Sequence, residues 1–319
     1  MPRVLVVGGA GYIGAHVCES LVSAGYEVRI FDDFSNGLRR RTDGIFKDVV
    51  VGDVLNREQL IGALSEVDAV IHLAAKKAVG ESVENPLKYY QNNVGGILNL
   101  LAAMSAMKVK RLVFSSTAAV YSPNGKPAIE ESDPTVPLSP YGATKLLSEQ
   151  IISSVSKAEG ISAISLRYFN VVGSSRPEFG DNSKDNLVPK VFTAYRSGTK
   201  PEIYGNDYPT KDGTCIRDYI HVADLADAHL AALKEVENGI VDEVFNVGSG
   251  TGYSVREMLD QMSTTMGVDL APKIVGRRAG DTPQLIASIA KIEKVLGWRP
   301  KLTLKNMIDS SWAAEKANS

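Results

Sequence analysis

The chain opens with the run Val4-Leu5-Val6-Val7-Gly8-Gly9-Ala10-Gly11-Tyr12-Ile13-Gly14. Its aliphatic residues predict a strand over residues 4–7, and the pattern that follows predicts a helix over residues 12–24. The glycines allow a tight turn and a close approach of the backbone to a ligand. Free N–H groups at the positive start of a helix favour a pyrophosphate. Because the glycines lie between a strand and a helix, the run predicts a dinucleotide-binding loop.

The first half of the chain continues to alternate strand and helix patterns. Apolar runs without a period of two are typical of strands that are buried on both faces of a parallel sheet. Strands are predicted over residues 27–31, 49–51, 69–73 and 111–115, and the most prominent helices over 87–107 and 141–157. This alternation predicts the α/β class, with a Rossmann-type doubly wound parallel sheet.

The rhythm changes after residue 169. Long loops are predicted over residues 173–186 and 205–213, strands over 218–222 and 244–247, and helices near 255–266, 289–296 and 304–315. We therefore predict a Rossmann domain over residues 1–169, with short returns near 218–247. A smaller, partly interleaved α/β domain over residues 170–319 is predicted to bind the substrate.

Composition narrows the classes of partner. A net charge of -2 over 319 residues argues against a nucleic-acid or anionic-membrane partner, and we expect the run Arg39–Arg41 to be a solvated loop. Two distant cysteines predict no disulfide framework and a cytoplasmic location. No Cys/His spacing suggests a metal, and neither a membrane span nor a signal peptide is expected.

Carboxylates follow the second and third predicted strands. Asp32-Asp33 lies about 20 residues after the glycine loop, where an acidic residue contacts the adenosine ribose. Its charge repels a 2′-phosphate and so favours NAD over NADP, although Arg39–Arg41 could accept that phosphate. Asp53 could contact the adenine amino group, or it could belong to a simple surface turn.

Tyr141 and Lys145 lie at the start of the helix predicted over residues 141–157. Residues four apart share a helix face, so the phenol and the ammonium point the same way. A neighbouring ammonium, together with a positive nicotinamide, would lower the pKa of a tyrosine from its usual value of about 10. Thr117 follows the preceding strand, at the sheet edge where ligands bind, and could hydrogen-bond a reacting oxygen. After a dinucleotide loop, this arrangement predicts a catalytic group.

Further motifs extend nearly to the end of the chain. They occupy residues 71–82, 89–94, 139–142, 166–170, 204–214 and 217–222, together with Arg277-Arg278 and Asp281. On these motifs the chain resembles the extended short-chain dehydrogenase/reductase family, and within it the UDP-glucose 4-epimerases. The glycine loop and the Tyr/Lys pair specify only the superfamily, whereas residues 77–82 and 204–222 are much more specific to the epimerases.

The resemblance implies a role for each matching residue. Tyr141 would be the base, Lys145 its partner and a ribose ligand, and Thr117 the third hydroxyl. The implied NAD ligands are Gly8, Gly11, Tyr12, Ile13, Gly14, Asp32, Asn36, Asp53, Val54, Leu73, Ala74, Ala75, Lys77, Asn93, Tyr141, Lys145 and Tyr168. The implied ligands of a UDP-hexose are Lys77, Thr117, Tyr141, Asn170, Asn186, Leu187, Tyr204, Arg217, Arg278 and Asp281. Arginine suits a diphosphate because its planar fork donates two parallel hydrogen bonds.

The implied activity is a reversible 4-epimerisation of UDP-galactose and UDP-glucose through a transient 4-keto sugar, with NAD bound throughout. Related dehydratases need an acid/base pair after the threonine, where Ala118-Ala119 cannot transfer protons. Family members pair as homodimers through the helices at 87–107 and 141–157.

Alternatives stay open from the sequence. A 4-epimerase of UDP-N-acetylglucosamine or UDP-glucuronate is the nearest, and a non-catalytic NAD-binding regulatory protein belongs to another class. The chain departs from the family at Thr117, where serine is common, and at Ala287-Ser288, where Ala-Asp is usual. Leu285 falls where the wall of the sugar pocket varies in size, which leaves the tolerance of N-acetylated sugars undecided.

Overall fold

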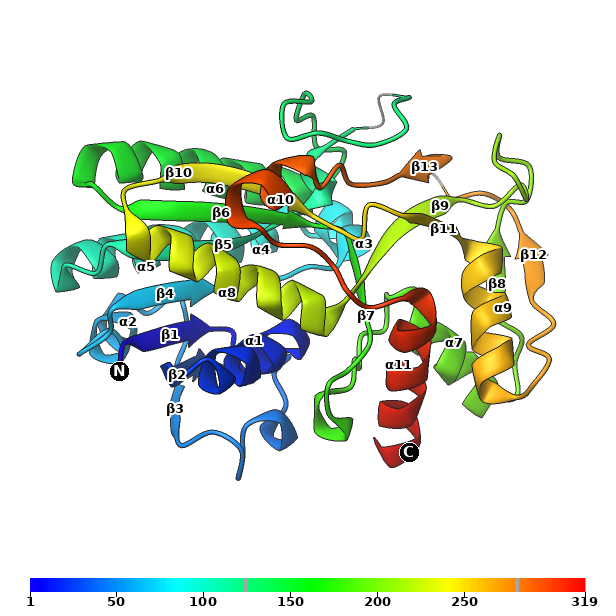
Figure 1. Ribbon diagram of the computed structural model, residues 1–319, viewed down its shortest axis with the longest axis horizontal. Helices are drawn as coiled ribbons and strands as arrows, with labels where there is room; N and C mark the ends of the chain where they lie inside the picture. Colours follow the sequence, from blue (N-terminus) through cyan, green and yellow to red (C-terminus); the bar gives the residue numbers. More distant parts are fainter. Residues whose placement is uncertain (123–124, 279–280, 319) are drawn as a thin grey trace.

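A seven-stranded parallel sheet forms the centre of the computed structural model, which describes residues 1–122, 125–278 and 281–318. The strand order is β10-β6-β5-β4-β1-β2-β3, so the chain winds outward from β1 in both directions (Figure 1). The strands are β1 (Arg3–Val7), β2 (Glu27–Asp32), β3 (Asp48–Val51), β4 (Ala69–His72), β5 (Arg111–Thr117), β6 (Ser162–Tyr168) and β10 (Asp242–Val247). The predicted doubly wound Rossmann-type fold is confirmed.

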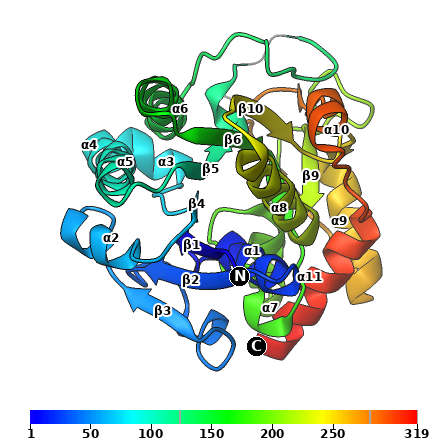
Figure 2. The same ribbon diagram turned by 60° about the vertical axis from the view of Figure 1, so that its left-hand side comes forward.

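Both faces of this sheet are covered by helices. α1 (Tyr12–Ser23) and α8 (Val222–Asn238) lie on one face, and α2 (Arg57–Ala63), α5 (Gly95–Met107) and α6 (Pro140–Glu159) lie on the other (Figure 2). In β1, Val4 and Val6 join the core cluster under α1 and α8, whereas Leu5 and Val7 join the cluster on the opposite face. Successive side chains of a strand point to opposite faces, which explains why the first strand is apolar at every position.

The helix predicted over residues 87–107 is not a single α-helix. α3 (Val79–Glu84) and α4 (Pro86–Tyr89) lead into one π-helical turn, Tyr90–Val94, before α5 begins. The turn holds Asn93, whose amide bonds the backbone of Lys76 and the hydroxyl of Thr144. Single π turns often occur at functional sites, and this one directs a polar side chain inward.

Several elements have no clear pattern in the sequence. α2 and α3 fall in gaps between predicted strands, where helical patterns were expected without bounds, whereas β6 and α8 were not predicted. β9 (Ile216–His221) ends one residue earlier than expected. The reason at that point is local: the imidazole of His221 accepts a hydrogen bond from the Ala223 N–H and caps α8, so Val222 already belongs to the helix.

Smaller sheets lie beyond the carboxyl ends of the large sheet, at the right of Figure 1. They contain β7 (Asn170–Val172), β9, β11 (Gly252–Ser254) and β13 (Gln284–Leu285), and separately β8 (Glu202–Tyr204) with β12 (Lys273–Val275). The remaining helices are α7 (Leu187–Arg196), α9 (Val255–Met266), α10 (Ala290–Leu296) and α11 (Leu304–Asn318), and short 3-10 turns span Arg39–Arg41, Ala118–Val120 and Pro177–Phe179.

The two groups of elements are interleaved near residues 218–247. β9 pairs with β7, β11 and β13, whereas α8 and β10 return to the large sheet. A separate apolar cluster packs α7, α9 and α11 through Phe192, Met258 and Ile308. The division into domains at residue 169 stays a prediction. None of the helices in the described part of the chain has the length and apolar character that a membrane span requires.

Candidate active site

The predicted cofactor residues gather at one edge of the large sheet. Gly8 follows β1, Asp32 ends β2 and Leu73 follows β4. Thr117 ends β5 and Tyr168 ends β6. Because all these strands are parallel, their carboxyl ends meet at the same edge, which is where ligands bind in such sheets (Figure 1).

The glycine loop has the shape that a pyrophosphate requires. A Cβ atom at Gly14 would lie 2.2 Å from the carbonyl oxygen of Gly8, so the loop and helix can approach this closely only with glycine. Gly11 is the N-cap of α1 and supplies no side chain to its first N–H groups. Those groups have no partner within the helix. The loop therefore fits the pyrophosphate of a dinucleotide.

Asp32 presents a buried carboxylate beside this loop. Its Oδ2 accepts a hydrogen bond from the Ala10 N–H at 3.0 Å, and its Oδ1 accepts one from the Phe34 N–H at 2.8 Å. Burial raises the pKa of Asp32, and these two N–H groups oppose that rise. Each oxygen keeps one lone pair, as the hydroxyls of an adenosine ribose require.

The run Arg39–Arg41 is not a solvated loop at its last position. Arg41 is buried, and its Nη2 donates to the carbonyl of Gly180 at 2.6 Å and to Oδ1 of Asn182 at 2.9 Å. The Arg39 guanidinium lies 3.8 Å from the centre of the Phe34 ring. Arg41 thus fastens the segment 173–186 to the cofactor half of the molecule. Tyr12 fastens it too, because its hydroxyl donates to the carbonyl of Gly173 at 2.6 Å.

Tyr141 is positioned by the start of α6. Ser139 caps this helix by accepting the Gly142 N–H at 3.2 Å, and Pro140 occupies its first turn. A Cβ atom at Gly142 would lie 2.3 Å from the Ala119 carbonyl oxygen. Glycine at this position therefore lets α6 pack directly on the turn that follows Thr117, which brings the phenol to the end of β5.

Lys145 lies one helical turn further along, deep in the core. Its Nζ donates to the Ser115 carbonyl at 2.7 Å and lies 4.7 Å from the centre of the Phe114 ring. Burial lowers the pKa of Lys145 to about 7, and the nearby carboxylate of Glu149 opposes this change.

The phenol of Tyr141 is not acidified by the chain alone. Burial in the crevice raises the pKa of Tyr141, and a hydrogen bond from Thr117 only partly opposes the rise. The ammonium of Lys145 is engaged by the Ser115 carbonyl instead. The predicted lowering of the Tyr141 pKa relied on two positive charges, the ammonium of Lys145 and a nicotinamide. The nicotinamide would therefore have to supply the charge that offsets burial.

Four hydroxyl-bearing residues, Ser115, Thr117, Tyr141 and Tyr168, meet at this edge. Thr117 is buried, and its Oγ1 accepts the Ala119 N–H at 3.2 Å. The Tyr168 hydroxyl bonds the Ser115 hydroxyl, and the pKa of Tyr168 is raised by burial and, to a smaller extent, by the nearby Tyr141. A phenol, an ammonium and three further hydroxyls on adjacent elements can bind an alcohol oxygen and move its proton.

Asn93 holds the loop after β4 in place. Its amide donates to the carbonyl of Lys76 and to Oγ1 of Thr144, both at 3.0 Å, and its oxygen accepts the Lys76 N–H at 2.9 Å. Both amide hydrogens are therefore engaged within the chain. Lys77 is exposed, and its Nζ reaches Oγ of Ser183 at 3.4 Å.

The predicted substrate residues lie mainly on the strands next to β6. β7 begins at Asn170, two residues after Tyr168, and pairs with β9, which carries Arg217. Arg217 forms an ion pair with Asp281 at 3.2 Å, and Leu285 of β13 lies opposite it in the register. The pairing of β7 with β9 therefore puts Arg217 on the strand next to the segment that follows Tyr168.

The remaining predicted residues are more dispersed. Arg278 stacks on Tyr204, with its guanidinium carbon 3.6 Å from the ring centre, and Asn186 donates to Asp181 at 2.7 Å just before α7. Asn36 and Asp53 are exposed, and Val54 is buried. Ile13, Ala74, Ala75 and Leu187 are partly buried.

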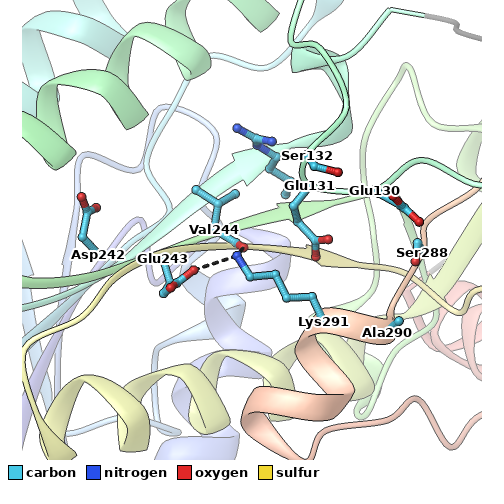
Figure 3. A pocket seen from close by; sticks show the side chains of 10 residues that line it. Glu130, Glu131, Ser132, Asp242, Glu243, Val244, Ser288, Ala290 and Lys291 are labelled. Carbon is cyan, nitrogen blue, oxygen red and sulfur yellow. Dashed lines mark hydrogen bonds and ion pairs between the residues drawn. The ribbon is translucent and has the colours of Figure 1, made fainter.

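A second hollow of about 570 Å³ lies at the edge strand β10, and Arg167, which pairs with Glu149 of α6, is among the residues that line it. Figure 3 shows Lys291 reaching across it to Glu243, with an Nζ–Oε2 distance of 2.7 Å. Lys291 also donates to the Val244 carbonyl, and Glu131 accepts the Asn246 N–H at 2.8 Å. These charges occupy the free backbone groups of an edge strand, which is how sheets avoid pairing with other chains. We assign this hollow to edge protection.

Comparison with known proteins identifies the family. Residues 4–248 match the NAD dependent epimerase/dehydratase family. The chain belongs to this family. It is 40% identical to a UDP-glucose 4-epimerase of Lacticaseibacillus casei over 97% of this chain and 95% of that protein.

Two solved structures of family members resemble the chain over its whole length. A UDP-glucose 4-epimerase of Stenotrophomonas maltophila with bound NAD and formylated UDP-arabinopyranose has a TM-score of 0.95 at 35% identity and covers 100% of this chain and 99% of its own. One from Brucella ovis in complex with NAD has a TM-score of 0.93 at 37% identity and covers 99% of each chain. The predicted family and fold are confirmed.

Sequence reasoning missed some residues of this site. Glu149, Arg167 and Ser116 form a buried network beneath Lys145, and Arg41 anchors the segment 173–186. Only Glu149 had a signal in the sequence, because it falls one further turn along the face of α6 that carries Tyr141 and Lys145.

Proposed function

We propose that this protein interconverts UDP-galactose and UDP-glucose by epimerisation at C4 and keeps NAD bound throughout. The observation that carries the proposal is the convergence of Tyr141, Lys145 and Thr117 beside a glycine loop shaped for a dinucleotide. The relatives named above as UDP-glucose 4-epimerases, two of them with NAD, support it.

The chain's own residues divide the work. Bound NAD supplies a reversible hydride acceptor at the sugar carbon. Tyr141 takes the proton of the 4-hydroxyl and later returns it, Thr117 orients that oxygen, and Lys145 holds positive charge behind the phenol. Asp32 and the amides of α1 hold the adenosine half of the cofactor.

UDP binding keeps the intermediate in place. Arg278 is exposed and offers a planar fork that suits a diphosphate. The guanidinium of Arg217 bonds Asp281 and the carbonyls of Ile216 and Thr282, so it would exchange these partners for a phosphate. Asn170 is the register partner of Tyr219 on the strand that carries Arg217. Because the nucleotide stays anchored, the 4-keto sugar can rotate and present its other face without leaving the site. Binding energy from the remote nucleotide thus serves the reaction.

A specific feature favours epimerisation over dehydration, which the same family includes. Dehydration requires an acid/base pair near the sugar. The 3-10 turn directly after Thr117 carries Ala118 and Ala119, which have no proton to transfer.

A homodimer is the proposed assembly. Each of the consecutive helices α3, α4 and α5 carries an exposed apolar side chain: Val83, Leu87 and Leu98 are 63%, 73% and 50% exposed. Exposed apolar side chains that gather on neighbouring elements are typical of an interface, and we propose that a second copy of the chain covers them. The free, buried Cys18 and Cys215 support a cytoplasmic location.

The function is tested by turnover of UDP-galactose by the protein as purified, without added NAD. We expect UDP-glucose to form and Tyr141→Phe to lower kcat about 100-fold or more, because general base catalysis contributes roughly 10²–10⁴-fold. Tyr195→Phe is the matched control, since Tyr195 is 41% exposed on α7. Full activity of Tyr141→Phe would refute the assigned base.

A substrate panel separates the alternatives. UDP-N-acetylgalactosamine and UDP-galacturonate are supplied under the same conditions. Faster turnover of either would replace the proposed sugar. NAD binding without turnover of any of the three would assign the protein a regulatory role instead.

A further inference from the structure

A buried ion pair lies beneath the catalytic helix. Glu149 of α6 and Arg167 of β6 form a two-pronged contact, with Nε–Oε1 at 2.9 Å and Nη2–Oε2 at 2.5 Å. Their side chains are only 6% and 7% exposed. The remaining arm of Arg167 donates to the Tyr121 hydroxyl at 2.8 Å, which in turn donates to Asn246 at 2.8 Å. Every nitrogen of the Arg167 guanidinium and both oxygens of the Glu149 carboxylate therefore have a hydrogen-bond partner.

Glu149 also holds the end of β5. The hydroxyl of Ser116 donates to the same Oε1 atom that Arg167 contacts, and Ser116 and Arg167 are register partners in the sheet. Ser116 lies between Ser115, whose carbonyl accepts Lys145, and Thr117. A single carboxylate thus fixes the strand that supplies both contacts of the catalytic pair.

The charge of Glu149 acts on Lys145, one helical turn earlier. The other groups near Lys145 are Tyr141 one turn earlier on its own helix, Ser115 and Phe114 of β5, and His72 of β4. The guanidinium of Arg167 is paired with Glu149 itself. His72 is uncharged at neutral pH, since burial lowers its pKa to about 3. Among the described residues that face Lys145, Glu149 is therefore the anion.

Stability does not explain this arrangement. Replacing a buried ion pair by apolar groups of similar volume is often neutral or even stabilising. A buried ammonium, by contrast, is readily neutralised unless an anion lies nearby. The pair is therefore better explained by what it does to Lys145 than by what it adds to the fold.

We propose that Glu149, clamped by Arg167, is a positioning residue for the epimerisation: it keeps Lys145 charged and holds Ser116–Thr117 against Tyr141. The proposal rests on the proposed function. The Glu149 carboxylate raises the pKa of Lys145, because a nearby anion stabilises the ammonium. Without the carboxylate, Lys145 loses its proton at a lower pH, so the ammonium behind Tyr141 is lost at a pH where the unaltered protein still has it.

The test is the pH profile of kcat for UDP-galactose in Glu149→Gln, which keeps the shape and removes the charge. We expect kcat at pH 8 to fall about 10-fold and the alkaline limb to move down by about one pH unit, with KM changed less than about 2-fold. The NAD content of the purified protein, read from its absorbance after denaturation, is expected to stay unchanged. Glu149→Asp keeps the charge, so we expect its alkaline limb to stay near that of the unaltered protein.

The double variant Glu149→Leu/Arg167→Met keeps the test valid if Glu149→Gln fails to fold. It leaves no unpaired charge in the core, because both members of the ion pair are replaced together. It should move the alkaline limb in the same direction but less far, because the positive charge of Arg167 is lost together with the carboxylate that acts on Lys145. Glu159→Gln is the matched control on the same helix, since Glu159 makes only a 3.7 Å surface contact with Lys110. An alkaline limb of the double variant that coincides with that of the unaltered protein overturns the proposal. An inactive unaltered protein would instead refute the proposed function.

Discussion

Replacing Gly14 by alanine tests the cofactor loop most directly. The new Cβ would lie 2.2 Å from the Gly8 carbonyl oxygen and 2.7 Å from Gly9 Cα, whereas real Cβ contacts stay beyond 3.0 Å. Both obstacles are backbone atoms, so no side chain can rotate away. Overpacking of this kind costs about 2–3 kcal/mol, and the higher helix propensity of alanine returns about 1 kcal/mol. We expect a net loss of about 1–2 kcal/mol in the free energy of unfolding.

The assay is urea unfolding of cofactor-stripped protein, followed by measurement of NAD retained after purification. Gly14→Ala should lower the urea midpoint and leave less NAD bound, because the loop must open to admit the methyl group. Gly62→Ala is the control within a helix, since a Cβ there meets nothing within 4 Å. It should raise stability by about 0.5–1 kcal/mol. If Gly14→Ala were as stable as Gly62→Ala and kept its NAD, the steric reasoning would be wrong.

Two further predictions concern the cofactor segment and the histidines. Arg41→Lys removes the fork that joins Gly180 and Asn182, at a cost of about 1–2 kcal/mol, and should speed NAD dissociation about 5- to 30-fold. Arg40→Lys loses only a 3.4 Å contact to the Glu178 carbonyl and should leave the rate of NAD dissociation unchanged. Equal dissociation rates in the two variants would contradict the anchoring role of Arg41. All four histidines have pKa values lowered by burial to about 3 or 4, so the unfolded chain binds more protons below pH 6.5. Stability should therefore fall as the pH drops from 6.5 to 5.5, by about 1 kcal/mol for each histidine, against the opposite effect of Asp218, whose pKa burial raises to about 6. A urea midpoint that rises as the pH drops from 6.5 to 5.5 would contradict the conclusion that the buried histidines are neutral.

The sequence predicted the elements whose signal is local. The glycine loop, β1, α1 and the first strands follow from short apolar runs and glycine positions, because one strand and one turn are enough to define them. The start of α6 is equally local, since Ser139 and Pro140 begin the helix that carries Tyr141. The elements missed, such as α8, depend on context: its first residue is set by the side chain of His221.

Site prediction failed where distant contacts decide the outcome. Arg41 looks like part of a charged loop, but carbonyl and amide oxygens 139 and 141 residues away bury it. Lys145 looks like the partner of Tyr141, yet in the folded chain its ammonium bonds the Ser115 carbonyl, 30 residues earlier. Neither partner is adjacent in the sequence.

By itself, the sequence determined the family and the class of fold, and it predicted the cofactor loop and the pair Tyr141 and Lys145, because residue type and spacing along one strand or one helix specify each of them. Only the tertiary structure decided the protonation and the support of that pair. The charge on Lys145 depends on burial and on Glu149 and Arg167, which meet because β5, β6 and α6 are packed together. Desolvation and ion pairing arise only when such distant groups leave water together.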